Sequence, residues 1–414
     1  MDITIDHARK RIAAIRAEIE RLKQSEFPYT HPRDALDQLG KMFERQQAVL
    51  EKVSPNAPAS VIFTACSTSV YQLFVYVPIL GFILRSANVR NAFETYAPLL
   101  RLTRSILGPD TKLIISSEWA YSPHVYQSIT DLPGFVLIGL PAPESANPLL
   151  IPLAGHELGH AVWKAENYST KFGKQIEDGI LKEITNNRWK EYEALFPQVK
   201  KEHYLNNDII ARTIWIAAYT YALRQAEEIF CDIFGMRLFS EAYLRAFEYL
   251  IAPGVPGERS VLYPNMERRV LHLMEAAKAL TVSVEATFTS RFKAEDEPRE
   301  STTKLLVSTA DAVSAALVPD LITQVLDIAL SRVIPQRAFA KVEEVCAGFG
   351  KVIPTTMAYS VTDILNAGWS CYLNDDLWKN YQQVQEENRG RVLKDLMLKS
   401  LEVSEAFERS REVQ

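Results

Sequence analysis

Cysteine is scarce in this sequence, with four residues among 414. No two of them form a C-x-x-C pair, and together they make no dense framework; they are Cys66, Cys231, Cys346 and Cys371. This spacing argues against a disulfide framework and favours a reduced, cytoplasmic setting. A chain of this length with 47% hydrophobic residues can bury a large core without disulfides or structural metals. Any metal site is therefore expected to serve chemistry and not folding.

Excess positive charge and an N-terminal signal sequence are also missing. The formal net charge is −5 and the pI is near 5.9, which gives no electrostatic reason to expect a nucleic-acid partner. Residues 1–24 contain no apolar signal core, so no secretory signal peptide is visible.

Charge itself is absent from residues 56–84, where "LFVYVPILGFIL" (73–84) is apolar throughout. A membrane-spanning helix needs roughly 20 mostly apolar residues. The preceding "TACSTSVYQ" is polar, and Pro78 interrupts the apolar run. We therefore expect a buried core helix here; membrane association is possible but not favoured.

Helical periodicity dominates the rest of the chain. In residues 7–24, apolar side chains recur three and four apart, at Ile12, Ile15, Ile19 and Leu22. This stripe indicates a helix docked on its own domain, with a dimer seam as the alternative, so the oligomeric state stays open. Further helices are predicted over 32–53, 58–85, 88–107, 170–196, 206–249 and 265–281, and the remainder, 303–414, is predicted to be all helix. Short apolar runs bounded by turn residues predict strands over 111–119 and 134–141.

The stretch "LLIPLAGHELGHAVWK" (149–164) contains the strongest chemical signal. His156 and His160 are four residues apart, so on a helix both face the same way. Two such imidazoles can bind one zinc ion at about 2.0–2.1 Å, and His-Glu-x-x-His on a helix is a metalloprotease pattern. Glu157 suits general-base work, taking a proton from the attacking water and later giving it to the leaving amine. The alternative is a pair of satisfied core histidines.

Two histidines do not complete a catalytic zinc site, so a third ligand is needed. Glu166, ten residues after His156, has the offset that metzincins use, but those proteins place glycine at the seventh position so that the chain can turn. Trp163 occupies that position here. Glu166 is therefore the weaker candidate.

The segment "RQAEEIFCDIFGMRL" (224–238) offers a better ligand. Glu228 and Asp232 lie four apart on a strongly apolar helix, where acids are rarely buried without a partner. Glu228 could bind zinc, and Asp232 could accept the free ring N–H of a zinc-bound histidine. Glu227 is the neighbouring alternative, although Cys231 and not an acid follows it by four residues. A solvated acidic patch remains a further interpretation.

These motifs together resemble the gluzincin metallopeptidases. "EEIFCDIFG" (227–235) is similar to the Glu-x-x-Ala-Asp-x-x-Gly element of the family that contains CAAX prenyl proteases and related bacterial membrane proteases. The resemblance covers roughly residues 112–281, and the chain lacks the several long spans of the membrane members. It implies a soluble gluzincin relative and does not imply prenylated substrates.

The same family carries a His-Pro pair followed by an arginine, and "YPNMERRV" (263–270) has that frame with tyrosine in place of histidine. The resemblance implies that Tyr263 stabilises the oxyanion by donating a hydrogen bond and that Arg269 binds a substrate carbonyl. A plain helix start is the alternative for this segment. The resemblance also implies an edge strand at 134–141, to which an extended peptide could add.

The expected fold is α+β and predominantly α-helical, with a zincin-like core that contains a small β-sheet. We divide the chain into an N-terminal helical region (1–110), a zincin-like metallopeptidase domain (111–285), a linker at about 286–302 and a C-terminal helical region (303–414). The expected function is a zinc-dependent peptidase that acts on a peptide or protein substrate. The alternative is a non-catalytic helical scaffold that retains a zinc site.

Overall fold

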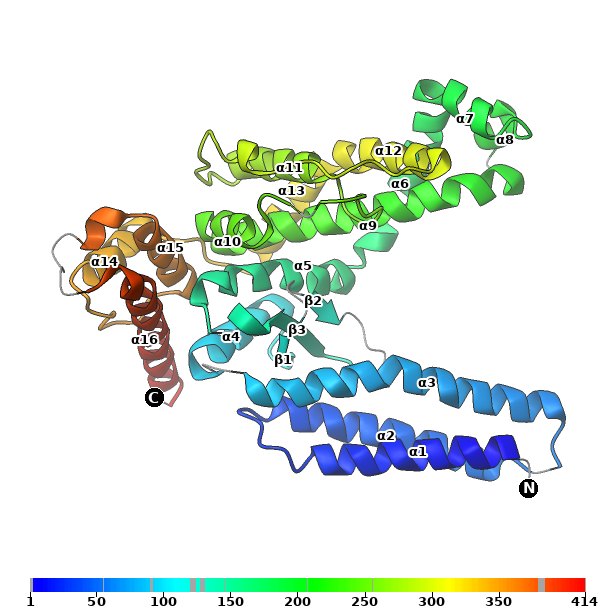
Figure 1. Ribbon diagram of the computed structural model, residues 1–414, viewed down its shortest axis with the longest axis horizontal. Helices are drawn as coiled ribbons and strands as arrows, with labels where there is room; N and C mark the ends of the chain where they lie inside the picture. The colour runs from blue at the N-terminus through cyan, green and yellow to red at the C-terminus, as the bar shows by residue number, and fades with distance from the viewer. Residues whose placement is uncertain are drawn as a thin grey trace. The chain divides into compact units, whose positions relative to one another are not determined.

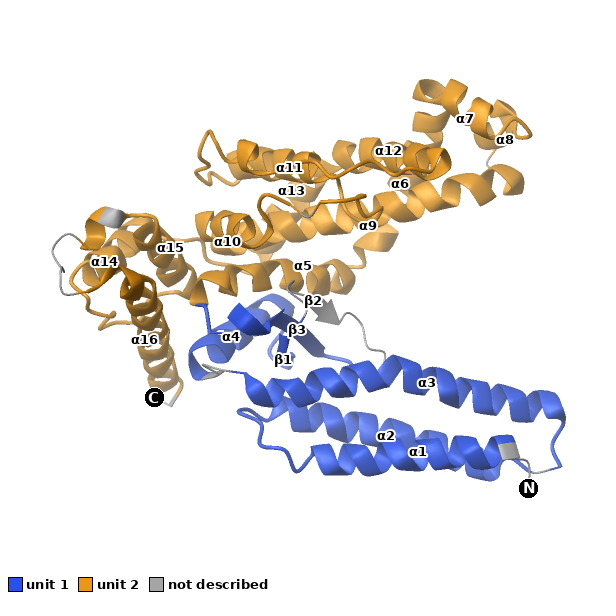
Figure 2. Ribbon diagram, viewed as in Figure 1, with its two compact units in different colours: residues 1–147 blue, residues 148–414 orange. Residues whose placement is uncertain are grey.

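The structure is a computed structural model that describes residues 3–413, apart from positions 55, 90–91, 120–123, 127–130, 145, 207, 255 and 379–383. The chain forms two compact units, residues 1–147 and 148–414 (Figure 2). Helices dominate both, and a small sheet lies in the first (Figure 1). The predicted class, α+β and predominantly helical, is confirmed. The domain boundaries drawn from the sequence stay predictions.

Three long helices build the core of the first unit: α1 (Ile3–Leu22), α2 (His31–Lys52) and α3 (Ala59–Arg85). The apolar stripe of α1 points inward, so that Ile12 and Ile19 are fully buried in one cluster with side chains of α2 and α3. The stripe therefore docks on its own unit, as the sequence indicated.

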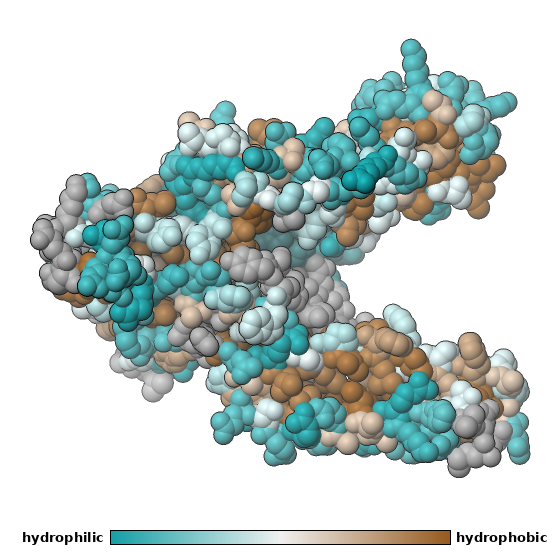
Figure 3. Space-filling model, in the orientation of Figure 1, coloured by the Kyte–Doolittle hydropathy of each residue, from teal (hydrophilic) through white to brown (hydrophobic). Residues whose placement is uncertain are grey.

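Only one side of α3 contributes to this core. Tyr76 and Leu80 are buried, whereas large side chains on the opposite side, including Phe63, Tyr71 and Phe74, are exposed. Figure 3 shows apolar atoms gathered along this helix. The prediction of a buried core helix is therefore wrong: only 33% of its most apolar window is buried. The helix also continues through Pro78.

Among the described residues, one helix meets the length and composition of a membrane span, and a second candidate depends on how a bent pair is counted. Ala59–Asn88, which is α3 with its short 3-10 extension, is long and apolar enough to cross a membrane. A second candidate arises only if α12 (Ser301–Ala316) and α13 (Val318–Ser331), which are bent by 48°, are counted as one span. Both of these helices pack against α9 in the second unit, as core helices of a folded domain do.

The sheet of the first unit has the strand order β1-β3-β2. After α4 (Ala97–Leu107), β1 (Lys112–Glu118) pairs in parallel with β3 (Phe135–Pro141), and both strands are apolar runs, as parallel strands buried on both faces usually are. The three-residue β2 (His124–Tyr126) pairs with the other side of β3. The predicted peptide-binding edge strand at 134–141 is therefore wrong, because β3 is central. A strand as short as β2 leaves no pattern that the sequence could reveal.

The second unit is helical. A 3-10 segment (Pro148–Leu153) leads into α5 (Ala154–Ala165), the helix of the two histidines. The elements that follow are α6 (Tyr168–Lys182), a π-turn (Glu183–Asn187), α7 (Trp189–Leu195), α8 (Lys201–Leu205), α9 (Ile209–Phe239), α10 (Glu241–Ile251), α11 (Met266–Ala279), α12, α13, α14 (Phe339–Phe349), α15 (Val361–Tyr372) and α16 (Glu386–Val413).

The helix predicted over 206–249 is two helices in the structure. Ser240 has φ 54°, and the chain turns there between α9 and α10. Serine is not a residue that strongly marks the end of a helix, so the sequence predicted one continuous helix. The turn lets α10 pack back on α9, which brings a tyrosine of α10 to the site described below.

Helix α9 is the centre of the second unit and contacts α5, α6, α10, α11, α12 and α13. Every residue from 225 to 239 is buried. Helix α5 crosses it at very short range, because a Cβ added to Gly155 would lie 2.9 Å from Cα of Gly235, and one added to Gly159 would lie 2.8 Å from Cα of Cys231. These two glycines allow the histidine-bearing helix to lie directly on α9.

Candidate metal centre

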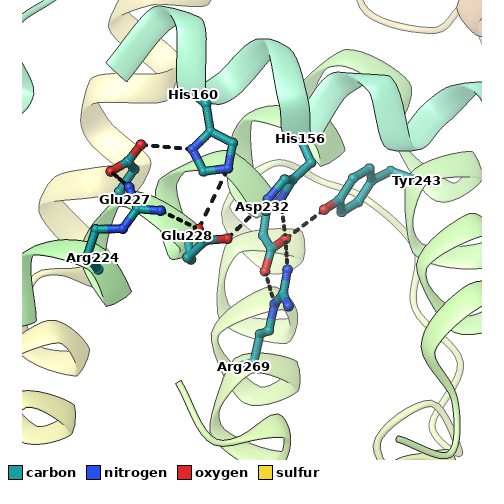
Figure 4. Close-up of polar contacts among 8 residues, drawn as sticks. All are labelled: His156, His160, Arg224, Glu227, Glu228, Asp232, Tyr243 and Arg269. Atoms are coloured by element: carbon teal, nitrogen blue, oxygen red, sulfur yellow. Dashed lines mark hydrogen bonds and ion pairs between the residues drawn. The ribbon is translucent and has the colours of Figure 1, made fainter. Parts of the chain in front are cut away.

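His156 and His160 project from the same side of α5 toward α9 (Figure 4). Their ring centroids are 5.0 Å apart, and the rings are nearly perpendicular at 83°. The spacing of four residues therefore has the consequence that the sequence predicted. Both imidazoles lie over the buried acidic segment of α9.

The carboxylate of Glu228 lies between the Nε2 atoms of the two imidazoles. Its Oε2 is 3.2 Å from Nε2 of His156, and its Oε1 is 3.7 Å from Nε2 of His160. The side chain is 1% exposed. Despite its closeness to His156, Oε2 has no hydrogen-bond partner of acceptable geometry among the described residues. A buried carboxylate oxygen in this state is costly unless a cation or a donor satisfies it.

The other nitrogen of each imidazole is held by a carboxylate. Nδ1 of His156 is 2.8 Å from Oδ1 of Asp232, and Nδ1 of His160 is 2.8 Å from Oε1 of Glu227. A carboxylate at Nδ1 fixes the tautomer that leaves Nε2 free to bind a metal, and it makes the imidazole more basic. Both histidines are therefore oriented as metal ligands usually are.

Asp232 is itself held by two further side chains. The hydroxyl of Tyr243 on α10 donates to it at 2.7 Å, and Arg269 on α11 donates from Nε and one Nη at 2.6 and 2.8 Å. Burial raises the pKa of Asp232, but the charge and hydrogen bonds of Arg269 outweigh it and hold that pKa well below its usual range. Asp232 is therefore ionised whenever the unit is folded near neutral pH.

Arg269 accordingly has a different position from the one that the resemblance implied. Its guanidinium is buried, and two of its three nitrogens donate to Asp232. It thus lies behind the histidine ligand His156, where it can hold Asp232 in place. The structure supports a positioning role for Arg269 in preference to contact with a substrate carbonyl.

Glu227 has a comparable support in Arg224. Nη1 of Arg224 donates to Glu227 at 2.5 Å, and Nη2 lies 3.5 Å from Oε1 of Glu228. Adjacent residues on a helix point about 100° apart, so Glu227 and Glu228 can meet two different atoms of the histidine pair. Helix geometry could have indicated this arrangement from the sequence alone, but the sequence analysis treated Glu227 only as an alternative third ligand. The role of Tyr243 depended on the unpredicted turn at Ser240.

The charges of this cluster favour a cation. Burial lowers the pKa of His156, but the carboxylates of Asp232 and Glu228 outweigh it and raise that pKa to about 10. In the metal-free protein, a proton on His156 therefore balances part of the negative charge. The three buried carboxylates of Glu227, Glu228 and Asp232 are paired with the guanidinium groups of Arg224 and Arg269, and Glu157 on α5 is a further buried acid.

Glu157 and Tyr263 complete the set of predicted site residues. Glu157 is buried on α5 beside His156. The guanidinium carbon of Arg269 lies 5.4 Å from the centre of the Tyr263 ring. Tyr263 is 39% exposed. Burial, followed by the charge of Glu228, raises the pKa of Tyr263 to about 12, and Glu157 contributes in the same direction. Tyr263 is therefore a neutral hydrogen-bond donor that lies close enough to Glu228 and Glu157 for their charges to raise its pKa.

The loop that carries Tyr263 is fixed by an interior ion pair. Arg259 donates to the backbone carbonyl of Tyr263 at 2.9 Å and to both carboxylate oxygens of Asp311 on α12 at 2.6 and 2.8 Å. Both side chains are almost fully buried. The position of Tyr263 therefore depends on α12, which follows the linker that the sequence predicted.

Two other candidate donors have different surroundings. Cys231 forms a three-donor group with His156 and His160, whose ligand atoms lie within 4.8 Å of one another. Its thiol is fully buried beneath Gly159, and burial raises its pKa well above the usual value. Glu166 ends α5 and pairs with Arg332 and Lys171. Glu228 is the better third ligand, since it is an acid that already lies between both imidazoles.

Comparisons with known proteins found no relative of this chain. No family model, no curated protein and no solved structure matches the chain. The resemblance to gluzincins consequently depends on the residues and geometry of this chain alone.

Proposed function

We propose that the chain is a zinc-dependent metallopeptidase in which His156, His160 and Glu228 hold the metal. One observation carries this proposal: the buried carboxylate of Glu228 lies between two Nε2 atoms, while a second carboxylate holds the Nδ1 atom of each imidazole. Without a cation, this arrangement concentrates negative charge in the interior. A bound cation would be held by the two histidines and Glu228, while Asp232 and Glu227 would hold the histidines in place.

The donors fit zinc in type and number. Two imidazole nitrogens and one carboxylate oxygen are the protein ligands of a catalytic zinc site that keeps a fourth position open. When bound, zinc polarises a carbonyl oxygen and lowers the pKa of water to about 7. Carboxylates at both Nδ1 atoms match the outer support of such sites.

The remaining chemistry belongs to side chains of the chain itself. Glu157 accepts a proton from the attacking water and donates it to the leaving amine. The hydroxyl of Tyr263 donates a hydrogen bond to the developing oxyanion; its raised pKa keeps it protonated at neutral pH. Asp232 and Glu227 hold the imidazoles, and Arg269 and Arg224 hold those acids in turn.

A non-catalytic scaffold that retains zinc is the second candidate, and the position of Cys231 favours it. Cys231 lies within 4.8 Å of donor atoms of both histidines. A fourth protein donor would close the site, as in structural zinc centres. The two functions differ in whether Glu157 matters and in whether Cys231 binds the metal.

One set of variants separates them. Bound zinc is measured by elemental analysis, and hydrolysis by a library of internally quenched peptides. The peptidase proposal expects Glu157→Gln to retain zinc and lose hydrolysis, Glu228→Ala to lose zinc, and Cys231→Ala to retain both. Glu166→Gln is the matched control, an acid near the end of the same helix that pairs elsewhere. Undiminished hydrolysis in Glu157→Gln would overturn the mechanism, and loss of zinc in Cys231→Ala would favour the scaffold.

A peptide or protein as substrate and a cytoplasmic location remain predictions from the sequence. Fractionation of expressing cells tests the location directly. The exposed apolar side of α3 makes the membrane fraction the one to compare with the soluble fraction.

A further inference from the structure

Two cysteines lie together where α14 packs on α15. The thiol of Cys346 donates to the carbonyl of Ala367 at 3.6 Å, one helical turn before Cys371. In an α-helix that carbonyl accepts the backbone N–H of the residue four positions later, here Cys371, so the two thiols are neighbours, and each shifts the pKa of the other. Both cysteines are free. Two free thiols on packed neighbouring helices, one of them bonded to the turn before the other, are candidates for a disulfide, which needs Cα atoms about 4.4–6.8 Å apart.

The two thiols differ in access and acidity. Cys346 is partly exposed, whereas Cys371 is buried. The neighbouring thiol of Cys371 lowers the pKa of Cys346, and the thiolate is the reactive form of cysteine. Glu343 of α14 and Ser370 of α15, which lie close to the two cysteines in the sequence, line a cavity of about 400 Å³. Because Cys346 is the more exposed of the two thiols, a reagent in solution reaches it first.

We propose that Cys346 and Cys371 form a redox-responsive pair that closes to a disulfide when it meets a low-molecular-weight disulfide as oxidant. The thiolate of Cys346 attacks one sulfur of the reagent, which expels one thiolate and leaves a mixed disulfide on Cys346. Cys371 then loses its proton and attacks the sulfur of Cys346, expelling the second thiol of the reagent. Two protein thiols are oxidised, and one reagent disulfide is reduced to two thiols.

The disulfide would fix α14 to a helix that anchors the second unit. Asn366 of α15 donates to the carbonyl of Phe239 at 2.9 Å and accepts from the backbone N–H of Ala242 at 3.0 Å, so that it bridges the turn between α9 and α10. Trp369 donates to the carbonyl of Leu149, just before α5, at 2.9 Å. Oxidation therefore ties α14 to the contacts that hold the ends of the site-bearing helices.

The test uses the full chain and oxidised glutathione, and it does not depend on zinc binding or hydrolysis. Free thiols are counted after denaturation, and peptides are mapped by mass spectrometry. We expect four free thiols in the reduced protein to fall to two, with one cross-linked peptide pair that joins Cys346 to Cys371, and a return to four after reduction. Four remaining thiols, or a cross-link between other cysteines, would overturn the proposal.

Variants define the order of attack. Cys371→Ser should stop at a glutathione adduct on Cys346, and Cys346→Ser should retain all three remaining thiols. Cys66→Ser is the matched control, a buried cysteine of the other unit, and should still form the disulfide. An adduct on Cys371 in the Cys346→Ser protein would contradict the assignment of Cys346 as the attacking thiol. In the wild-type protein, the oxidised form should unfold at a higher temperature than the reduced form.

Discussion

The long helices α3 and α9 show opposite relations between charge and burial. Helix α3 has no charged residue before Arg85, yet a large part of its surface is exposed. The second half of α9, residues 225–239, is buried throughout and yet contains Glu227, Glu228 and Asp232. Hydropathy alone would place the first helix deeper in the protein than the second.

This difference distinguishes burial that packing explains from burial that needs a further explanation. Burial of an acid is unfavourable unless partners satisfy it, so the acids of α9 require an explanation beyond packing. The histidines and arginines around them supply most of it, and a metal would supply the remainder. The exposed face of α3 involves no comparable cost, because apolar atoms are common on protein surfaces.

Removing Asp232 should have the largest effect on this comparison. In Asp232→Ala, the buried guanidinium of Arg269 loses its carboxylate, and breaking a buried ion pair costs about 3–5 kcal/mol. Urea unfolding should show a correspondingly lower free energy of unfolding. Asp178→Ala on α6 is the control, because its ion pair with Lys174 is exposed and its removal should leave stability unchanged. Equal effects at the two positions would show that the buried network adds nothing.

Two phenylalanines of α3 compare a buried with an exposed position on this helix. Phe82 is 0% exposed and Phe74 is 77% exposed. Phe82→Ala should lower the free energy of unfolding by about 3–5 kcal/mol, whereas Phe74→Ala should change it by no more than about 0.5 kcal/mol. A large loss in Phe74→Ala, measured by urea unfolding at low protein concentration, would mean that this face is covered in solution.

The close crossing of α5 and α9 should respond to one methyl group. A Cβ at Gly155 would lie 2.9 Å from Cα of Gly235, and such overpacking typically costs about 1–3 kcal/mol. Gly155→Ala should therefore be destabilising and should weaken zinc binding, because the histidine helix must move. Gly390→Ala in α16, where the new methyl meets open space, should instead stabilise the protein by up to about 1 kcal/mol. The contrast is measured by thermal unfolding and zinc titration.

The smallest expected effect is a pH dependence from His272 on α11. Burial, with the nearby charge of Arg268, lowers the pKa of His272 from 6.5 to about 4. Between these values the unfolded chain binds a proton that the folded chain does not, so this group makes stability fall as the pH falls from 6.5 to 4. His272→Gln should lose part of that dependence in urea unfolding at stepped pH. An unchanged slope would contradict this assignment.

Several features of the site could be predicted because helix periodicity is a local property. The spacing of His156 and His160, and that of Glu228 and Asp232, places each pair on one helix face, and the structure brings the two faces together. Asp232 meets Nδ1 of His156 at 2.8 Å, as the sequence led us to expect. Buried acids on an apolar helix were an informative signal.

Other features depended on contacts between distant residues. Tyr243 reaches Asp232 because the chain turns at Ser240, and Arg269 pairs with Asp232 across 37 residues. The burial of α3 could not be inferred from its composition, because nothing local shows which side a neighbouring helix covers. The central position of β3 depended on the three-residue strand β2.

A zinc titration tests the central claim most directly, namely that the buried acids of α9 serve a metal. Zinc affinity is measured by competition with a chromophoric chelator for the wild-type protein, Glu228→Gln and Glu227→Gln. We expect one zinc ion per chain in the wild type, a loss of about 10–100-fold in affinity for Glu227→Gln, which alters only the support of His160, and a larger loss for Glu228→Gln. A wild-type protein that binds no zinc, or three proteins with equal affinity, would contradict the account.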